Sequence, residues 1–188
     1  MSTESEAYEM ADVKQDKAVE YSRAYVKALA GAAEELSGIL NEPDMLAGEP
    51  KGFSKLRNAV TGMMALGEDS SPQELLGSLE RLQNAAEQTI SGMQENGYEK
   101  GVHGIFAKGL AEFAKSQQAS FSKHIQDALD PEQPINEQEL EKKAAGRVKV
   151  SLDNLQKEVQ GVIKEKHERV HTAEKNGPSK SSASMGKR

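Results

Sequence analysis

The sequence predicts an all-α protein, an elongated bundle or coiled coil of long antiparallel helices without a sheet. Apolar residues recur along the chain in alternating steps of three and four, and no stretch alternates as a strand does. Aromatic residues make up only 4% of the 188 residues, and Trp is absent. Each helix therefore has only a narrow apolar stripe to bury, which suits bundles and coiled coils. The length fits one domain.

The first helix is expected from about Thr3 to Leu40. Thr3 and Glu6 fit a capping box at its start. At ~1.5 Å per residue such a helix measures about 57 Å, which predicts an elongated molecule. Its seam of apolar and small residues is Tyr8, Ala11, Gln15, Ala18, Ser22, Tyr25, Leu29, Ala32, Leu36 and Ile39.

Turn-forming residues divide the rest of the chain. Prolines and glycines in 41–52 predict a loop, followed by a short helix from Phe53 to about Gly67. Ser71 followed by Pro72 and Glu74 is the strongest helix start in the chain.

Two later regions bound the remaining helices. The glycines of 92–109 indicate a hinge, a kink or a turn, and the sequence does not choose among them. Asn136 and Glu139 open the last helix. We therefore predict a helical domain over residues 1–175 and a disordered basic tail over 176–188.

Charge is distributed unevenly along the chain. The net charge is −6, from 24 Lys and Arg against 30 Asp and Glu. Residues 141–188 hold 12 basic and 6 acidic side chains, which leaves 12 basic against 24 acidic in 1–140. The halves carry +6 and −12, which favours self-association of opposite ends, a basic end for an anionic surface, or simply solvated helix faces.

The expected location is cytoplasmic, with peripheral membrane association. The N-terminus is acidic where a signal peptide is basic, and no membrane-spanning apolar run exists. The absence of Cys excludes disulfides and thiolate chemistry.

One catalytic motif occurs. His167, Glu168 and His171 spell HExxH, which on a helix can hold zinc with a glutamate as general base. A zinc peptidase needs a third ligand, and no His and only one carboxylate, Glu174, follow His171. The peptidase is a remote alternative. We predict no enzyme activity, no catalytic residue, no metal and no cofactor.

A basic cluster lies within the last helix. Lys142, Lys143, Arg147 and Lys149 have no aromatic residue among them for stacking on bases, and most of the chain is acidic, so we expect no nucleic-acid partner. Anionic lipid headgroups require only surface charge. These four residues are the predicted lipid-binding residues, and a solvated face that balances the acidic half is the alternative.

Three groups of residues follow one another along the chain: Leu66-Gly67-Glu68-Asp69, then Leu75, Leu76, Leu79 and Leu82, and later the basic cluster, Leu152-Asp153 and Lys157. This order resembles the BAR family of dimeric, crescent-shaped membrane-curvature proteins. Family members often have an apolar helix ending in a Leu-Gly-Glu/Asp turn before a Leu-rich helix, and later Lys/Arg, Leu-Asp and Lys. The likeness spans roughly residues 17–157.

Leu155 stands where many family members have a second Asp, and the glycines of 92–109 are unusual for a long curved helix. The resemblance implies a divergent or truncated member that binds anionic membranes as a dimer. The alternative function is that of a cytosolic helical adaptor, or a secreted bacterial effector, that binds a protein partner.

We predict a homodimer, because a first helix of this length has no partner of equal length in the chain except the last helix. Tyr25, Leu29 and Leu36 are the predicted dimer seam, and Leu29→Asp with Leu36→Asp should dissociate or unfold the protein because it buries charge. Sedimentation equilibrium measures the mass in solution. A clean monomer near the chain mass of 20.4 kDa at micromolar concentration would contradict the prediction.

Overall fold

The structure is a computed structural model that describes residues 3–97, 101–132 and 136–181, with side chains for 19–97, 101–132 and 136–170. This part of the chain contains six helices and no strand, and the protein is 86% helical, which confirms the all-α prediction. The helices are α1 (Thr3–Leu40), α2 (Pro43–Leu46), α3 (Phe53–Met64), α4 (Pro72–Asn96), α5 (Val102–Leu129) and α6 (Glu137–Ser181).

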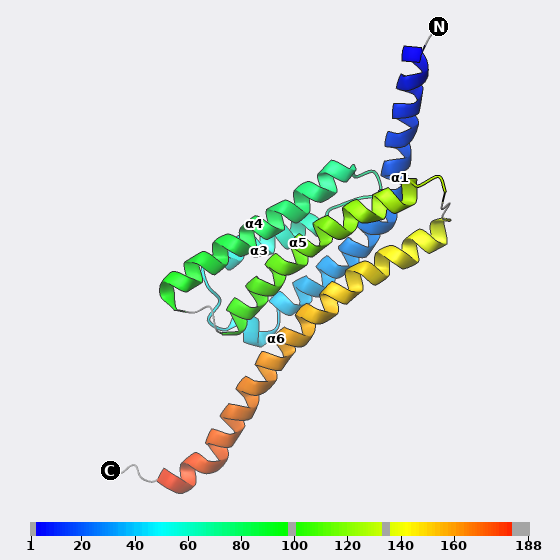
Figure 1. The fold of residues 1–188 in the computed structure, drawn as a ribbon. Coiled ribbons are helices and arrows are strands. Elements are labelled where there is room, and N and C mark those ends of the chain that lie inside the picture. The colour runs from blue at the N-terminus through cyan, green and yellow to red at the C-terminus, as the bar shows by residue number, and fades with distance from the viewer. Residues whose placement is uncertain (1–2, 98–100, 133–135, 182–188) are drawn as a thin grey trace.

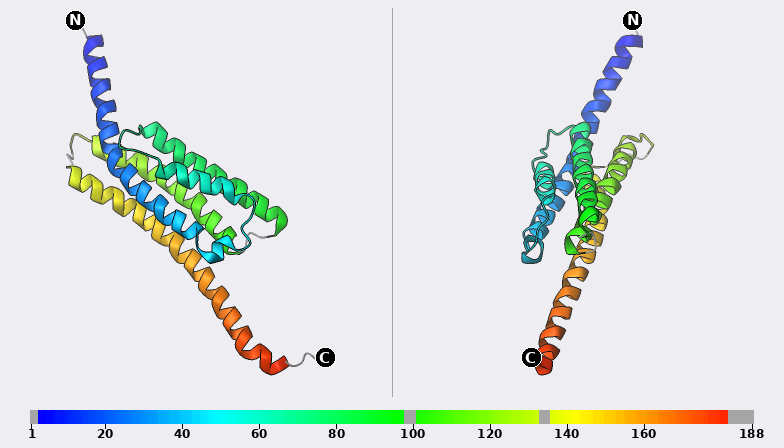
Figure 2. Two further views of the ribbon diagram at one scale, coloured as in Figure 1. Left: turned by 180° about the vertical axis from the view of Figure 1, so that it is seen from behind. Right: turned by 90° about the vertical axis from the view of Figure 1, so that its left-hand side faces the viewer.

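Five of the helices lie side by side in one bundle, and the short α2 closes one end (Figure 1). The chain reverses direction at each connection from α3 to α6. Helices α1 and α6 are neighbours that run in the same direction, so the antiparallel arrangement does not extend to this pair. The start of α1 and the end of α6 project from opposite ends of the bundle (Figure 2).

The core is assembled from one stripe of each bundle helix. Its largest members, Tyr25, Phe53, Phe106, Phe113 and Phe121, are all at most 1% exposed. Complete burial of a large apolar side chain contributes about 1.5–3 kcal/mol. Small residues fill the remaining contacts and let the helices approach closely: Ala32, Ala33, Ala86, Ala107, Ala114 and Ala144 are buried.

The predicted helix starts are confirmed at the two strongest signals. Ser71 Oγ accepts a hydrogen bond from the Glu74 amide at 3.1 Å, and Asn136 Oδ1 accepts one from the Glu139 amide at 2.8 Å. Gly97 follows α4 at φ 75°, a left-handed conformation that glycine adopts without steric cost. The glycine-rich region therefore contains the turn between α4 and α5.

Two boundaries differ from the sequence prediction. The segment predicted as a loop contains α2, whose Met45 is buried and whose Met45 carbonyl lies 2.7 Å from His103 Nε2. Arg57 anchors the same segment through Leu40 O at 2.6 Å and Asn41 Oδ1 at 3.0 Å. At the other end, α6 continues to Ser181, past the tail boundary predicted at residue 175, and residues 182–188 of the tail lie outside the described residues.

Gly109 sets the distance between α5 and α6. A Cβ atom at this position would lie 3.1 Å from Leu155 Cγ and 3.3 Å from Leu155 Cδ1. A larger side chain therefore requires the two helices to separate or Leu155 to move.

We expect Gly109→Leu to lower the free energy of unfolding by about 1–3 kcal/mol, because overpacking outweighs the gain in helix propensity. Urea denaturation measures the change. Gly161→Leu is the matched control, since a Cβ there meets nothing within 4 Å, and it should stabilise by up to about 1 kcal/mol. Equal effects of the two substitutions would contradict the close approach.

Candidate functional site

The predicted lysines lie on the solvent side of α6. Its buried stripe comprises Leu140, Ala144, Val148, Leu152, Leu155, Val159 and Ile163. At 100° per residue, the opposite side of the helix is centred near Gly146. Lys142, Lys143 and Lys149 lie within about 60° of that centre and are exposed.

Arg147 differs from the three lysines. Its side chain is 22% exposed, and Nη2 donates to Asp127 Oδ2 of α5 at 2.9 Å. The hydrogen bond from Arg147 holds the pKa of the Asp127 carboxyl below its usual range. Arg147 therefore belongs to the α5–α6 contact, and its assignment to the outward basic cluster is corrected.

Two further lysines extend the outward face. Lys157 and Lys164 are exposed and lie within about 20° of the same centre. Lys164 is not among the residues predicted from the sequence, and Lys157 is predicted only through the family resemblance. The spacing of Lys142, Lys149, Lys157 and Lys164 in steps of seven, eight and seven is a signal that predicts a common face. We call Lys142, Lys143, Lys149, Lys157 and Lys164 the α6 lysine face.

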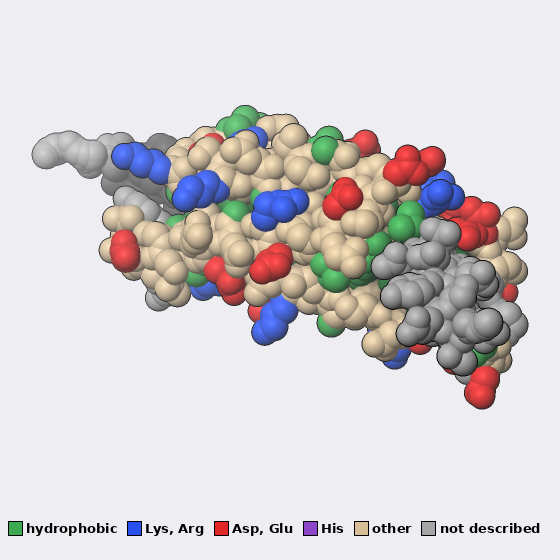
Figure 3. Space-filling view, turned by 90° about the horizontal axis from the view of Figure 1, so that it is seen from above, with side chains coloured by type: hydrophobic (Ala, Val, Ile, Leu, Met, Phe, Trp, Pro, Cys, Tyr) green, Lys and Arg blue, Asp and Glu red, His purple; other side chains and the backbone are tan. Residues whose placement is uncertain are grey.

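Elsewhere the surface is mixed. The side of the molecule seen in Figure 3 carries basic and acidic side chains scattered singly among small polar and apolar groups. Along the α6 lysine face, by contrast, Asp153 is the one acidic residue within about 60° of the centre between Lys142 and Lys164.

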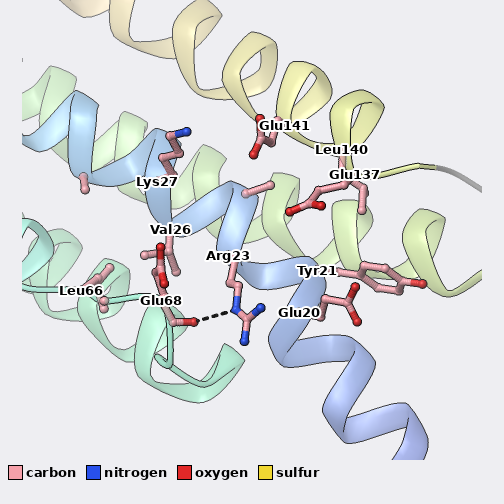
Figure 4. A pocket seen from close by; sticks show the side chains of 13 residues that line it. Glu20, Tyr21, Arg23, Val26, Lys27, Leu66, Glu68, Glu137, Leu140 and Glu141 are labelled. Atoms are coloured by element: carbon pink, nitrogen blue, oxygen red, sulfur yellow. Dashed lines mark hydrogen bonds between the residues drawn. The ribbon is translucent and has the colours of Figure 1, made fainter.

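A groove lies between the first buried turns of α1, the start of α6 and the α3–α4 connection (Figure 4). Its volume is about 460 Å³, and its floor includes Val26 and Leu140. Four carboxylates from three elements line it: Glu20, Glu68, Glu137 and Glu141.

Two basic residues, Arg23 and Lys27, also line this groove. Arg23 Nε donates to the Glu68 backbone oxygen at 3.3 Å and holds the α3–α4 connection against α1. Four carboxylates against two cations make the groove suited to a positively charged group. None of the described His, Asp and Glu side chains gather in a set of three that could hold a metal ion.

A buried polar junction joins α1, α5 and α6. The Tyr25 hydroxyl donates to Gln117 Oε1, and Gln117 Nε2 donates to the Arg147 backbone oxygen at 3.4 Å. The His124 ring lies 5.2 Å from the Tyr25 ring, and its Nε2 lies 3.3 Å from the Tyr21 backbone oxygen. Gln117 and His124 are at most 1% exposed. We call Tyr25, Gln117, His124, Asp127 and Arg147 the polar junction.

Burial shifts the pKa of two residues of the polar junction, Tyr25 and His124. It raises the pKa of Tyr25 to about 12, against an ordinary value of 10.0. It also holds the pKa of His124 below its ordinary value, and the nearby Arg147 and Lys143 charges act in the same direction. Both side chains are therefore neutral at pH 7.

The residues of the predicted dimer seam lie inside this bundle. Tyr25, Leu29 and Leu36 are each 0% exposed within a single chain. Helix α1 packs against α3, α5 and α6, and a second copy could reach the seam only if the bundle opened. The seam assignment is therefore corrected to an intramolecular contact. Dimerisation stays a prediction and requires another surface.

The HExxH segment lies where α6 leaves the bundle. His167 Nε2 is 3.1 Å from both carboxylate oxygens of Asp44, and Lys166 Nζ is 3.6 Å from Asp44 Oδ1. The hydrogen bond from His167 lowers the pKa of Asp44. Glu168 is within 4.0 Å of Lys164, and the His171 side chain lies outside the described residues. His167 thus joins α6 to α2.

No protein-family model, curated protein or solved structure matches this chain. The BAR resemblance therefore remains a prediction. Among the described residues, none of the helices has an apolar stretch long enough to cross a lipid bilayer.

We expect Tyr25→Phe to lower the free energy of unfolding at pH 8 by about 1–3 kcal/mol, because Gln117 Oε1 loses its buried donor. The raised pKa of Tyr25 means that its hydroxyl contributes stability below pH 10 that is lost as the pH rises toward 12. The difference between wild type and variant should therefore narrow over this range in urea denaturation. Tyr21→Phe, at a partly exposed position, is the control and should change little. If the difference in the free energy of unfolding between wild type and Tyr25→Phe did not change with pH, the assigned role of the buried Tyr25 hydroxyl would be wrong.

Proposed function

We propose that this chain is a non-enzymatic binding module that attaches to anionic membrane surfaces through the α6 lysine face. The single observation that carries this proposal is the set of five exposed lysines on the side of α6 opposite its buried stripe. Lysine ammonium groups can interact with the diffuse negative charge of lipid headgroups without a fixed partner geometry.

The dimensions of the face suit a flat or gently curved surface. From Lys142 to Lys164 the helix rises about 33 Å. All five lysines are exposed along α6, and Lys142 also borders a groove between α1 and α6. Val150, which is 66% exposed, lies on the same side and offers one apolar contact near headgroup depth.

The energetics predict weak, salt-sensitive binding. Each lysine near an anionic leaflet contributes about 1 kcal/mol. The net charge of the whole chain is −6, so the remaining surface opposes the attraction. Screening shortens the reach of each charge to about 8 Å at physiological ionic strength, and attachment should weaken steeply as salt is added. A second copy in a dimer would double the number of contacts and strengthen attachment without new chemistry.

The protein-partner alternative is favoured by a different observation, the groove between α1 and α6. Its apolar floor and excess of carboxylates suit a lysine- or arginine-bearing segment of a partner protein. Binding at this groove would depend on Glu20, Glu137 and Glu141 and would be independent of the distal lysines. The two functions therefore depend on different residues of α6 and can be distinguished by substitution.

We expect the quadruple substitution of Lys142, Lys149, Lys157 and Lys164 by Gln to abolish pelleting with phosphatidylserine-rich liposomes at low salt. The four side chains are exposed, so far-UV circular dichroism should show unchanged helicity. A liposome co-sedimentation series from low to physiological salt measures the effect. Wild type should pellet at low salt and be largely released at physiological ionic strength.

The matched control replaces Lys51, Lys55, Lys108 and Lys115 by Gln, four exposed lysines outside α6. It changes the net charge equally and should keep wild-type pelleting. Loss of pelleting in both quadruple variants would indicate that net charge, rather than the face, drives attachment. Failure of wild type to pellet at low salt would overturn the membrane proposal and leave the protein-partner function.

A further inference from the structure

His124 occupies a position that the proposed function does not use. It lies near the end of α5 and contacts Tyr21 and Tyr25 of α1. The side chain is 1% exposed, its ring stacks at a tilt against Tyr25, and its Nε2 donates to the Tyr21 backbone oxygen in the neutral tautomer. This imidazole therefore joins the first buried turns of α1 to α5.

Burial, followed by the charges of Arg147 and Lys143, disfavours a positive charge on His124 and outweighs the Tyr21 backbone oxygen and Asp127, which favour one. Helix α6 contributes Lys143 and Arg147, α1 contributes the neutral Tyr21 and Tyr25, and α5 itself contributes Lys123 and Asp127. The one carboxylate among them already accepts a hydrogen bond from Arg147.

Arg147 makes the surroundings still less favourable to protonation. Its Nη1 is buried and has no hydrogen-bond partner among the described residues. A protonated imidazole would be buried near the partly buried Arg147 guanidinium, where charges are poorly screened, and the exposed Lys143 would add a weaker repulsion.

We propose that the polar junction is an acid-sensitive latch: protonation of His124 releases the start of α6 and the first buried turns of α1, while α3 and α4 stay packed. This inference is independent of membrane attachment. It rests on the burial of His124, its contacts to α1 and the two cations that α6 places beside it.

The direction of the pH dependence follows from linkage. The pKa of His124 is depressed in the folded chain, so its contribution to stability is complete above the ordinary value of 6.5. That contribution is lost as the pH falls below 6.5 toward the folded value, because the opened state then binds the proton more readily. At pH 5 the open state therefore gains relative to pH 7.5, by at most about thirtyfold for a group with an ordinary pKa of 6.5.

Local opening, not whole-chain unfolding, is the distinguishing outcome. Helices α3 and α4 contribute no group to the polar junction and hold their own buried stripes, which include Phe53, Leu56, Leu75, Leu79 and Leu82. They should therefore remain protected when the junction opens.

Hydrogen exchange followed by mass spectrometry, corrected for the intrinsic pH dependence, tests the latch on the full chain. Between pH 7.5 and 5.0 we expect exchange to rise severalfold, by at most about thirtyfold, in residues 19–27, 120–128 and 140–149, and less than twofold in α3 and α4. His124→Gln keeps a side-chain N–H for Tyr21 O and cannot take up the proton, so its response should disappear. His167→Gln, at an exposed histidine that contacts Asp44, is the matched control and should respond as wild type does.

A second variant keeps the test decisive if His124→Gln fails to fold. Arg147→Met removes the nearest α6 guanidinium while keeping an apolar side chain of similar reach, and its acid response should fall to less than half that of wild type. An unchanged response in His124→Gln or in Arg147→Met would overturn the proposal. So would a uniform rise in exchange over all helices, or no rise in wild type.

Discussion

The scarcity of large apolar side chains is the constraint on which the rest of this structure depends. Each helix can bury only a narrow stripe, so stability requires several stripes to converge on one line. The helices achieve this by packing closely. Alanines line the buried side of α1, Gly109 brings α5 against Leu155 of α6, and four buried phenylalanines fill space between the helices. Polar residues complete the core where α1, α5 and α6 meet, and their hydrogen bonds offset the cost of burying them.

Helix pairing decides which surfaces are available for function. Because the described part of the α1 seam, from Tyr25 to Ile39, packs against α3, α5 and α6, these residues are not available to a second copy. Helix α6 buries one side, and most of its charge therefore falls on the other. The amphipathic pattern that packs the last helix thus also produces the α6 lysine face. The side of the helix on which a charged residue lies, rather than its position along the chain, decides whether it belongs to this face.

Local signals were read correctly from the sequence, and tertiary relations were not. The caps at Ser71 and Asn136 depend on residues within one turn, so they could be predicted. His103 of α5 contacts α2, and Arg57 of α3 fixes the chain just before it; no local sequence pattern reveals these contacts. Periodicity identified the Tyr25–Leu36 stripe as buried but not its partner. Arg147 was predicted together with the lysines because it is close to them in sequence. At about 100° per residue, however, it lies on a different side of the helix from Lys142 and Lys149. His124 and Gln117 fell on an apolar stripe, where only the packed helices show their contacts.

Arginine and lysine hold different roles in this fold, and the difference supports placing function on α6. Arg23, Arg57 and Arg147 each donate a hydrogen bond that fixes a connection or a helix contact. A planar guanidinium with several donors suits such fixed geometry. The five lysines of the α6 lysine face are exposed instead, and Lys164 makes only a long contact to Glu168 on its own helix. A flexible ammonium group costs little to leave in water and adapts to a target without fixed geometry. These three arginines thus serve contacts within the fold, whereas the exposed lysines of the α6 lysine face have the accessibility that the proposed attachment to an anionic surface requires.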